Sequence, residues 1–293
     1  MIIVRTVSDL RTALRERRDT PVGLVPTMGA LHEGHLTLVR AARAENRTVV
    51  MSIFVNPTQF DEQADLAAYP RTEDRDAALA AEAGVDIVFA PDAAEMYPTG
   101  FATTVRIAGP VTETLEGAQR GRAHFDGVAT IVTKLLLAAL PDAAYFGAKD
   151  AQQVAVLQRL VADLDLPVRL VVCPTSRDAD GLARSSRNAR LTADERARAL
   201  AIPRALQAVT DAAAAGLADV EALRARGLAE LAGEGIDLEY LALVDPATFE
   251  PAAALDRPVL VAVAARVGRT RLIDNTVISA HAVGPGPLSQ EGA

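Results

Sequence analysis

Short apolar runs rich in β-branched residues alternate with alanine-rich amphipathic stretches over the first 173 residues of the chain. Runs of this kind are typical of strands in a parallel sheet, and the stretches between them repeat their apolar positions at helical spacing. The pattern predicts strands over residues 22–25, 48–55, 85–89, 143–146 and 168–172. It predicts helices over residues 34–45, 74–83, 127–140 and 150–163. Alternation of this sort indicates a parallel sheet covered by helices.

The pattern changes after Pro174. A polar segment, TSRDADGLARSSRN, is followed by helical stretches over residues 192–215 and 219–232 and by strand-like runs over 238–244, 259–267 and 272–278. The chain is therefore predicted as an α/β protein with a Rossmann-like doubly wound parallel sheet and a second, smaller α+β domain. We expect residues 1–175 to form the first domain, residues 176–283 to form a lid domain, and residues 284–293 to be a disordered tail.

The composition narrows the class of partner. The chain has 30 Lys and Arg against 38 Asp and Glu, a formal net charge of -8, with 4% aromatic residues and no Trp. An acidic chain poor in stacking side chains is unsuited to nucleic acid. The single cysteine, Cys173, excludes an internal disulfide, and no apolar stretch is long enough to span a membrane. Because the start, MIIVRTVSDLR, lacks a cleavable apolar core, we expect a cytoplasmic protein without a membrane or nucleic-acid partner.

Two glycines and two histidines occupy the junction between the strand at 22–25 and the helix at 34–45, in the segment PTMGALHEGH. At such a junction free backbone N–H groups and the positive end of the helix dipole form a site for phosphate. Gly29 and Gly34 would allow close approach of a nucleotide, and His32 and His35 would face the same side of the first helical turn. Both rings could then stabilise charge on a phosphorus under attack. The alternative is that either histidine is only a polar residue at a helix start.

Carboxamide side chains follow two other strands. Gln59 lies in FVNPTQF, after the strand at 48–55, and Gln153 lies at the start of the helix after Phe146. A carboxamide both donates and accepts hydrogen bonds, so it can hold a polyol carboxylate without acting as a nucleophile. Two solvated glutamines remain the alternative.

Lys149 and Asp150 begin the helix that follows the strand at 143–146. This position places an ammonium group beside the phosphate crevice and a carboxylate where it could hold Mg²⁺. A helix cap beside a solvated lysine is the structural alternative. Ser185, Ser186 and Arg187 lie in the polar segment at the domain boundary, where they could close over a triphosphate or serve simply as a linker.

These segments together resemble a known family. LHEGH is similar to the H-x-G-H signature of the nucleotidyltransferase superfamily, and PTMGALHEGH in full resembles the pantothenate synthetases. Further matches follow in order: FVNPTQF, YPRT, LEG with HFDGV, FGAKDAQQ and DGLARSSRN. The resemblance covers about residues 20 to 280. It implies a homodimeric ligase that uses ATP and Mg²⁺ to condense pantoate with β-alanine.

The resemblance also implies roles for particular residues. It gives catalytic roles to His35, His32, Lys149 and Arg187. Gln59 and Gln153 would contact pantoate, and Asp150 would hold Mg²⁺, with Asp76 as a second candidate. The implied ATP-binding residues are Met28, Gly29, Ala30, Leu31, His32, Glu33, Gly34, His35, Gly147, Ala148, Lys149, Asp150, Ser176, Arg184, Ser185, Ser186 and Arg187.

The chain departs from the family pattern at several places. Ala148 stands where relatives usually carry Glu, and Arg184 stands where they usually carry Met or Leu. The Glu carboxylate and the apolar contact with adenine are therefore absent. The segment RGRAHF has one residue more than the family's Arg-x-x-His-Phe, which leaves Arg120 and Arg122 as alternatives for a phosphate contact.

The implied reaction has two steps. The pantoate carboxylate attacks the α-phosphate of ATP, and the amine of β-alanine then attacks the resulting pantoyl adenylate, releasing AMP. Two alternatives remain open at the level of sequence: another adenylyl or cytidylyl transferase of the same fold, and a catalytically silent adenine-nucleotide sensor, which Ala148 and Arg184 would permit.

Overall fold

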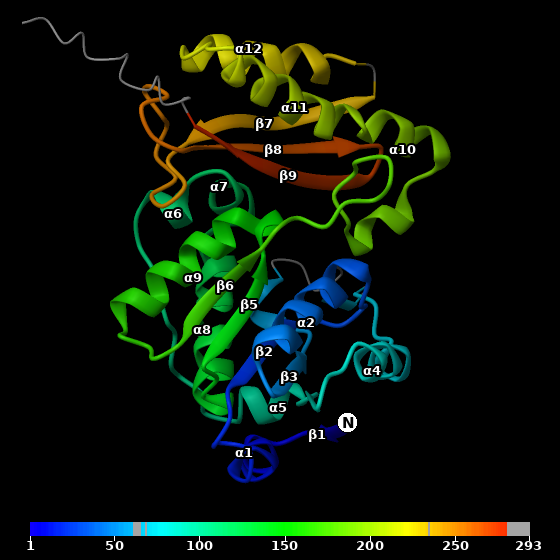
Figure 1. Ribbon diagram of the computed structural model, residues 1–293, viewed down its shortest axis with the longest axis vertical. Coiled ribbons are helices and arrows are strands. Elements are labelled where there is room, and N and C mark those ends of the chain that lie inside the picture. The colour runs from blue at the N-terminus through cyan, green and yellow to red at the C-terminus, as the bar shows by residue number, and fades with distance from the viewer. Residues whose placement is uncertain (61–65, 68, 234, 280–293) are drawn as a thin grey trace, which may run out of the picture.

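The computed structural model describes residues 1–60, 66–67, 69–233 and 235–279 (Figure 1). Six parallel strands form the larger sheet, in the order β1-β4-β3-β2-β5-β6. Their bounds are β1 Ile2–Val4, β2 Val22–Thr27, β3 Thr48–Ile53, β4 Ile87–Phe89, β5 Ala143–Gly147 and β6 Arg169–Cys173. The strand order reverses between β2 and β5, and in a doubly wound sheet such a switch point opens a crevice at the carboxyl ends of the strands.

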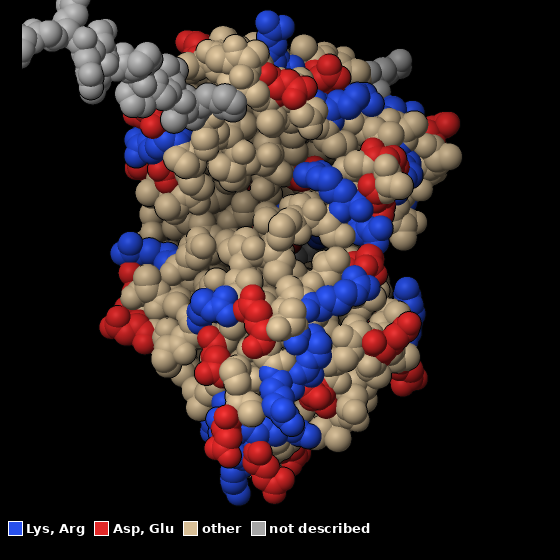
Figure 2. All heavy atoms as spheres, in the orientation of Figure 1, with Lys and Arg blue, Asp and Glu red and all other residues tan. Residues whose placement is uncertain are grey.

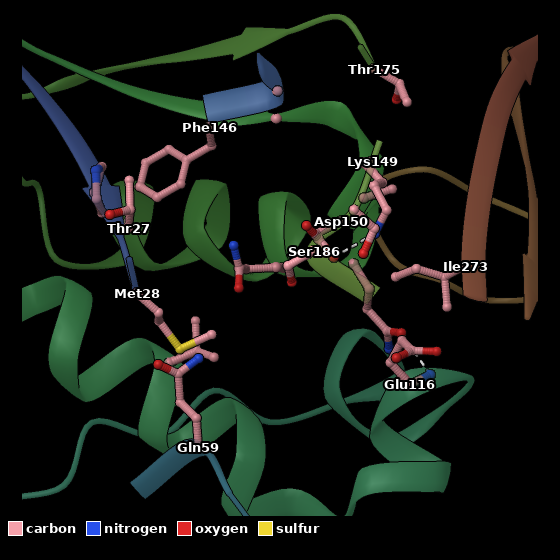
Figure 3. A pocket seen from close by; sticks show the side chains of 18 of the residues that line it. Thr27, Met28, Gln59, Glu116, Phe146, Lys149, Asp150, Thr175, Ser186 and Ile273 are labelled. Carbon is pink, nitrogen blue, oxygen red and sulfur yellow. Dashed lines mark hydrogen bonds and ion pairs between the residues drawn. The ribbon is translucent and has the colours of Figure 1, made fainter. Parts of the chain in front are cut away.

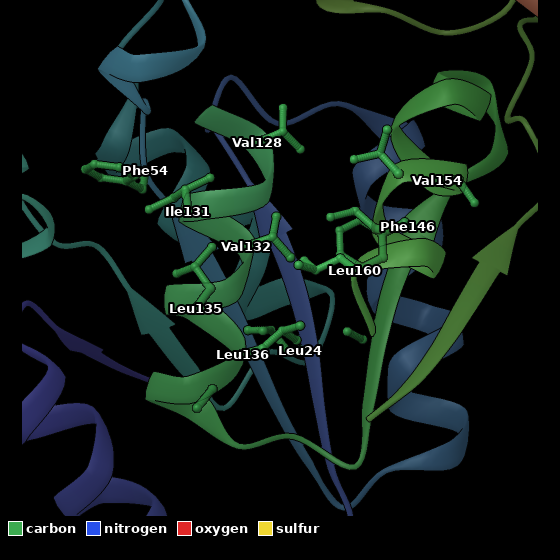
Figure 4. Packing of buried hydrophobic residues seen from close by; sticks show 14 of the residues in the cluster. Leu24, Phe54, Val128, Ile131, Val132, Leu135, Leu136, Phe146, Val154 and Leu160 are labelled. Atoms are coloured by element: carbon green, nitrogen blue, oxygen red, sulfur yellow. The ribbon is translucent and has the colours of Figure 1, made fainter. Parts of the chain in front are cut away.

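Helices cover both faces of this sheet. One face packs against α2 and α4 through a cluster that includes Val39, Met51 and Ala80. The other packs against α1, α8 and α9, and Figure 4 shows Val132 and Leu136 of α8 directed toward Leu24 of β2. The helices of this part are α1 Val7–Arg15, α2 Glu33–Glu45, α4 Glu73–Glu82, α5 Ala93–Met96, α6 Pro110–Glu113, α7 Glu116–Arg120, α8 Arg122–Ala139 and α9 Ala151–Asp163, with short 3-10 helices η1 Pro57–Gln59 and η2 Ala148–Asp150. The predicted doubly wound α/β fold is confirmed.

A smaller antiparallel sheet forms the second part of the chain. It contains β7 Ile236–Val244, β8 Val259–Val267 and β9 Thr270–Ile278 in that order. The helices α11 Ala201–Ala214 and α12 Val220–Leu231 cover its outer face, and the short helices η3 Ser186–Arg190 and α10 Ala193–Ala199 precede them (Figure 1). Its inner face contributes Leu260 and Ala262 to the same apolar cluster as Phe125 and Val128 of α8. The two parts of the molecule therefore meet through a shared core.

Several elements differ from the sequence prediction. The pattern does not predict β1 and α1, because a strand of three residues that pairs only with the distant β4 has too little periodicity to be recognised. The single helix predicted over 192–215 is two helices that meet at Leu200, where Pro203 has no N–H to donate to the carbonyl of Ala199. The helix predicted from residue 127 begins at Arg122. The predicted tail, residues 284–293, lies outside the described residues, as do residues 280–283 of the predicted lid domain.

No helix within the described residues is long and apolar enough to cross a membrane.

A glycine in α8 allows the helix to pack closely on η1. A Cβ atom at Gly127 would clash with the backbone carbonyl of Thr58, and the Gly127 carbonyl accepts a hydrogen bond from Asn56 Nδ2 at 3.2 Å. We expect Gly127→Ala to cost about 1–3 kcal/mol of unfolding free energy because the core would be overpacked. The shift of η1 would also raise the KM for any ligand of Gln59. Urea unfolding and steady-state kinetics measure both effects. Gly233→Ala, whose Cβ would meet no atom closer than 3.9 Å, is the matched control and should change neither.

Candidate active site

A cavity of about 300 Å³ opens at the carboxyl ends of the large sheet, between the two parts of the molecule. Figure 2 shows a hollow in this position with Lys and Arg side chains along one edge. Many residues predicted from the sequence line the cavity: Met28, His32, Gly34, His35, Gln59, Gly147, Lys149, Asp150, Gln153, Ser176, Arg184, Ser185, Ser186 and Arg187. Segments that are more than a hundred residues apart thus meet at one place. The predicted residues Gly29, Ala30, Leu31, Glu33, Ala148 and Asp76 are not among its lining.

Asp76 anchors the backbone of the loop between β2 and α2. Its two carboxylate oxygens accept hydrogen bonds at 2.8 Å from the backbone N–H groups of Ala30 and Leu31, and Thr72 Oγ1 donates to it at 3.1 Å. Asp76 is only 1% exposed. Gly29 and Ala30 have positive φ angles of 81° and 50°, a conformation that this anchored turn stabilises. A metal-binding role for Asp76 does not fit this arrangement, because both of its oxygens accept hydrogen bonds and the residue is not part of the cavity lining.

The two histidines cap helix α2 and also line the cavity. The backbone N–H of Gly34 donates to His32 Nδ1 at 3.1 Å, and the backbone N–H of His32 donates to His35 Nδ1 at 3.3 Å. Because an amide N–H can only donate, both Nδ1 atoms act as acceptors. Each neutral ring must then carry its proton on Nε2. The cap therefore fixes the tautomer that leaves both Nε2–H groups as donors.

Both rings are held in the neutral form. Burial, together with the nearby His32 ring, lowers the pKa of His35 to about 3. Burial, followed by the charges of Lys149 and Arg184, also lowers the pKa of His32. The ring centroids lie 4.1 Å apart, so the prediction that the two histidines face the same side is confirmed. At neutral pH they can serve as neutral hydrogen-bond donors to an oxyanion.

The lowered pKa of His35 predicts a pH dependence of stability. Between its folded value of about 3 and the unfolded value near 6.5, the unfolded chain binds the additional proton. The unfolding free energy should therefore fall as the pH drops through this window, by at most about 1.4 kcal/mol per pH unit from this group. Urea unfolding from pH 7 to 4 measures the slope. His35→Asn, which cannot titrate, should show a shallower slope, and equal slopes would contradict the assignment.

Lys149 and Asp150 face the cavity from the turn η2. The Lys149 side chain is 15% exposed and its Nζ lies 3.8 Å from Asp150 Oδ1, while the Asp150 side chain is 52% exposed. Asp150 stands at the N-cap position of α9 but makes no capping hydrogen bond, so the purely structural alternative is wrong for its carboxylate. Figure 3 shows Lys149, Asp150 and Ser186 close together.

The single carboxylate of Asp150 fits a Mg²⁺ ion that is held mainly by the phosphates of a bound substrate and by water. Among the described residues, no group of three or more His, Cys, Asp or Glu side chains is arranged to hold a metal ion. Mg²⁺ is commonly held by one or two carboxylates together with substrate phosphates and water. The exposed carboxylate of Asp150, beside the Lys149 ammonium group, could serve as one such carboxylate.

The predicted carboxamides reach the cavity from two elements, Gln59 from η1 and Gln153 from the first turn of α9. Gln59 Oε1 accepts a hydrogen bond from Asn56 Nδ2 at 2.9 Å, which fixes the amide orientation and leaves its N–H₂ group to donate to a ligand. Gln153 also lines the cavity. Its neighbour Gln152 is structural instead, since its Nε2 donates to the carbonyls of Val111 and Thr114. His124 Nδ1, which the sequence did not single out, contacts the carbonyl of Gln59 at 3.0 Å.

The SSR segment brings a cation, Arg187, to the cavity. Ser185 Oγ caps the turn by accepting from the Arg187 N–H at 3.2 Å. No ion-pair partner of the Arg187 guanidinium lies within 4 Å among the residues that the structure describes. Burial and the charge of Arg120 lower the pKa of Arg187. Arg184, by contrast, is paired with Asp178 at 3.1 Å. Arg187 is therefore a cation that an anionic ligand would neutralise.

An ion-pair network at the edge of the cavity was not predicted. Glu116 of α7 accepts two hydrogen bonds from Arg271 of β9, at 2.6 and 2.8 Å, and one from Tyr240 Oη at 2.8 Å. Arg120 Nε lies 3.1 Å from the same carboxylate. These hydrogen bonds and cations hold the pKa of Glu116 at about 2, against the opposing effect of its burial. Glu116 and Arg271 are 155 residues apart, and no local sequence pattern marks their pairing.

The network also distinguishes the two arginines of RGRAHF. Arg120 lines the cavity, whereas Arg122 is exposed and pairs with Glu113 at the surface. Of the two alternatives, Arg120 is therefore the one that faces the cavity.

Comparisons with known proteins identify the family of the chain. The family model for pantoate-beta-alanine ligase matches residues 2–277. A pantothenate synthetase of Rhizorhabdus wittichii is 52% identical over 281 residues, covering 95% of this chain and 99% of the relative. One of Corynebacterium glutamicum is 55% identical over 262 residues, covering 87% and 92%.

Solved structures extend the agreement to the fold. A pantothenate synthetase of Thermus thermophilus has a TM-score of 0.89 at 48% identity, covering 94% of this chain and 99% of that one. A pantoate-beta-alanine ligase of Francisella tularensis, complexed with beta-gamma ATP and beta-alanine, has a TM-score of 0.78 at 33% identity, covering 94% and 97%. With the family model matching nearly the whole length and relatives about half identical, the chain belongs to the pantoate–β-alanine ligase family.

Proposed function

We propose that the protein condenses pantoate with β-alanine to form pantothenate, using ATP and releasing AMP and pyrophosphate. The observation that carries the proposal is the convergence of His32, His35, Lys149 and Arg187 on one cavity that Gln59 and Gln153 also line. Cations and neutral imidazole donors suit a triphosphate, while carboxamides suit a hydroxy acid.

The first step forms pantoyl adenylate. A carboxylate oxygen of pantoate attacks the α-phosphorus of ATP, and the bond from that phosphorus to the pyrophosphate oxygen breaks. Two anions repel in water, so alignment of the pair within the cavity is a major contribution, worth roughly 7–11 kcal/mol. The Nε2–H groups of His32 and His35 would donate to the oxygens that gain charge, and Lys149 and Arg187 would balance the leaving pyrophosphate.

The second step releases the product. The amine of β-alanine attacks the activated carbonyl carbon, the new C–N bond forms, and AMP leaves with the oxygen that joined it to pantoate. Gln59 would orient the pantoate carboxylate through its N–H₂ group, because its amide oxygen accepts a hydrogen bond from Asn56. We assign no covalent nucleophile. Cys173 lies buried at the end of β6, where burial raises the pKa of its thiol.

Further parts of the proposal concern Mg²⁺, assembly and location. Asp150 would hold Mg²⁺, which when bound neutralises charge on phosphate oxygens. Residues from 176 onward would act as a lid that carries Arg187 over the nucleotide. We further propose a homodimer, as the family resemblance implies, and a cytoplasmic location, where ATP is available. Light scattering at several protein concentrations tests the dimer, and a fluorescent fusion tests the location.

Two other functions make different predictions in a substrate-omission assay. With ATP and pantoate alone, the proposed ligase should release pyrophosphate, and only the complete mixture should yield AMP and pantothenate. An adenylyl or cytidylyl transferase of another specificity would release pyrophosphate from ATP or CTP without pantoate. A nucleotide sensor would bind ATP with no release under any condition. Product identification by mass spectrometry separates these outcomes, and either of the last two would overturn the proposal.

A further inference from the structure

A strand of the second domain holds the backbone of the turn that carries Lys149. The side-chain amide of Asn275, on β9, donates to the carbonyl oxygen of Ala148 at 2.9 Å and to that of Lys149 at 2.8 Å. The two segments are 126 residues apart in the sequence. One carboxamide therefore uses both of its donors on the turn η2.

The turn lacks a side-chain cap of its own. Neither Gly147 nor Asp150, at the N-cap positions of η2 and α9, supplies a capping hydrogen bond. The ammonium group of Lys149 has its carboxylate neighbour only at 3.8 Å, so the position of the Lys149 backbone sets where that charge lies in the cavity.

Asn275 is itself rigidly mounted. It pairs with Ala262 in the ladder between β9 and β8, and its backbone N–H donates to Asp274 Oδ1 at 2.8 Å. The Asp274 side chain is 1% exposed and forms an ion pair with Arg177 at 2.6 Å. Along β9, alternate residues share a face of the sheet, which puts Asn275 on the same face as Ile273 and Arg271. Ile273 also lines the cavity (Figure 3).

We propose that Asn275 is a positioning residue for Lys149, through which the second domain sets the catalytic ammonium group in place. The proposal rests on the function proposed above, because it assigns the consequence to adenylate formation. It makes the placement of Lys149 depend on contact between the domains. When β9 separates from η2, both carbonyls lose their donor and the turn is free to shift.

If Asn275 acts by donating hydrogen bonds, its variants should be impaired in a different order than if it acts only by packing. Asn275→Asp retains nearly the same volume but turns a double donor into an acceptor that faces two carbonyls. Asn275→Ala removes volume and donors together. Donation predicts that the Asp variant is more impaired than the Ala variant, whereas packing predicts the reverse. Thr276→Ala, on the next residue of the same strand, is the matched control.

The test measures the rate of pantoate-dependent pyrophosphate release at saturating ATP and pantoate, with thermal unfolding of each variant. We expect Asn275→Ala to slow this step about 10- to 100-fold, the scale of a misplacement near 1 Å, with a smaller change in the KM for pantoate. Asn275→Asp should be slower still at pH 7.5. Relative to the unaltered protein, it should recover as the pH falls toward 5.5, because a protonated carboxyl group donates again. Thr276→Ala should match the unaltered protein.

Amide hydrogen exchange provides a second readout that needs no activity. Exchange at residues 148–152 should accelerate in both Asn275 variants and not in Thr276→Ala. The proposal is overturned if Asn275→Asp is milder than Asn275→Ala, if pH has no differential effect, or if exchange at η2 is unchanged. Failure of the proposed function would look different, since the unaltered protein itself would then release no pyrophosphate with pantoate.

Discussion

His35→Ala is expected to slow pantoate-dependent pyrophosphate release by about 10²–10³-fold at saturating ATP, the loss typical of removing one preorganised oxyanion donor. The physical reason is the fixed tautomer. His35 Nδ1 accepts the His32 N–H at 3.3 Å, so the neutral ring offers Nε2–H as a donor, and burial that lowers the pKa of His35 to about 3 keeps the ring neutral. Quenched-flow measurement of the first turnover reports this step directly.

The variant should remain folded. Loss of the reciprocal cap on α2 should cost about 0.5–2 kcal/mol, so cooperative melting is retained. Thr37→Ala is the control on the same helix, because Thr37 Oγ1 donates only to the carbonyl of Gly34 at 2.8 Å and does not line the cavity. It should turn over normally. Normal turnover by His35→Ala would remove the histidine from the chemistry and leave it only the capping role.

Arg271→Met is expected to have the largest effect on stability, about 3–5 kcal/mol of unfolding free energy. Arg271 bridges Glu116 of the first domain and Glu239 of β7, and the three side chains are only 14%, 11% and 12% exposed. Its removal leaves two carboxylates buried without their shared cation. Arg271 and Tyr240 both join the second domain to Glu116 of the first. Loss of the Arg271 side chain should therefore weaken the contact between the domains. Urea unfolding measures the cost.

A matched surface arginine separates burial from simple charge loss. Arg266 pairs with the other oxygen of Glu239 at 3.0 Å, but its side chain is 50% exposed, so Arg266→Met should cost only about 0–1 kcal/mol. Adding Glu116→Gln to Arg271→Met should restore part of the lost stability, because it removes one of the two buried carboxylates that lost the Arg271 cation. Equal costs for the two arginines, or no coupling in the double variant, would contradict the account.

The same network predicts a response to acid. The pKa of Glu116 is held at about 2, below its ordinary value near 4.5. Its contribution is therefore complete above pH 4.5 and is lost as the pH falls toward 2. Arg271→Met should remove much of this dependence, since the cation that lowers the pKa is absent.

Local patterns were sufficient for much of the fold. The strands β2 to β6 and the helices α2, α4, α8 and α9 carry enough periodicity to be recognised, whereas the short helices α5, α6 and α7 do not. The LHEGH segment is recognisable because its strand, turn and helix start are contiguous in the sequence. The short edge strand β1 is recognised only through its pairing with β4, 85 residues along the chain. The break at Leu200 depends on a single missing N–H from Pro203, within a stretch otherwise favourable to helix.

In the candidate site, too, some residues could be predicted from local sequence motifs and others could not. His32, His35, Lys149 and Arg187 are found from local motifs, since each follows a strand or lies in a recognisable segment. Asp76 was a second candidate metal ligand from the family resemblance alone, and its carboxylate accepts hydrogen bonds from the backbone of Ala30 and Leu31, which no local pattern indicates. Asn275 and the Glu116 network act across domains, where tertiary contact alone defines their roles.

Isotope transfer gives the most direct test of the central claim, that pantoate attacks the α-phosphorus of ATP. With pantoate labelled by ¹⁸O in its carboxylate, the pantoyl adenylate route places one labelled oxygen in the phosphate of AMP, which mass spectrometry detects after a complete reaction with β-alanine. Attack at the γ-phosphorus would instead place the label in inorganic phosphate and produce ADP. We expect labelled AMP and unlabelled pyrophosphate, and labelled inorganic phosphate with ADP would contradict the account.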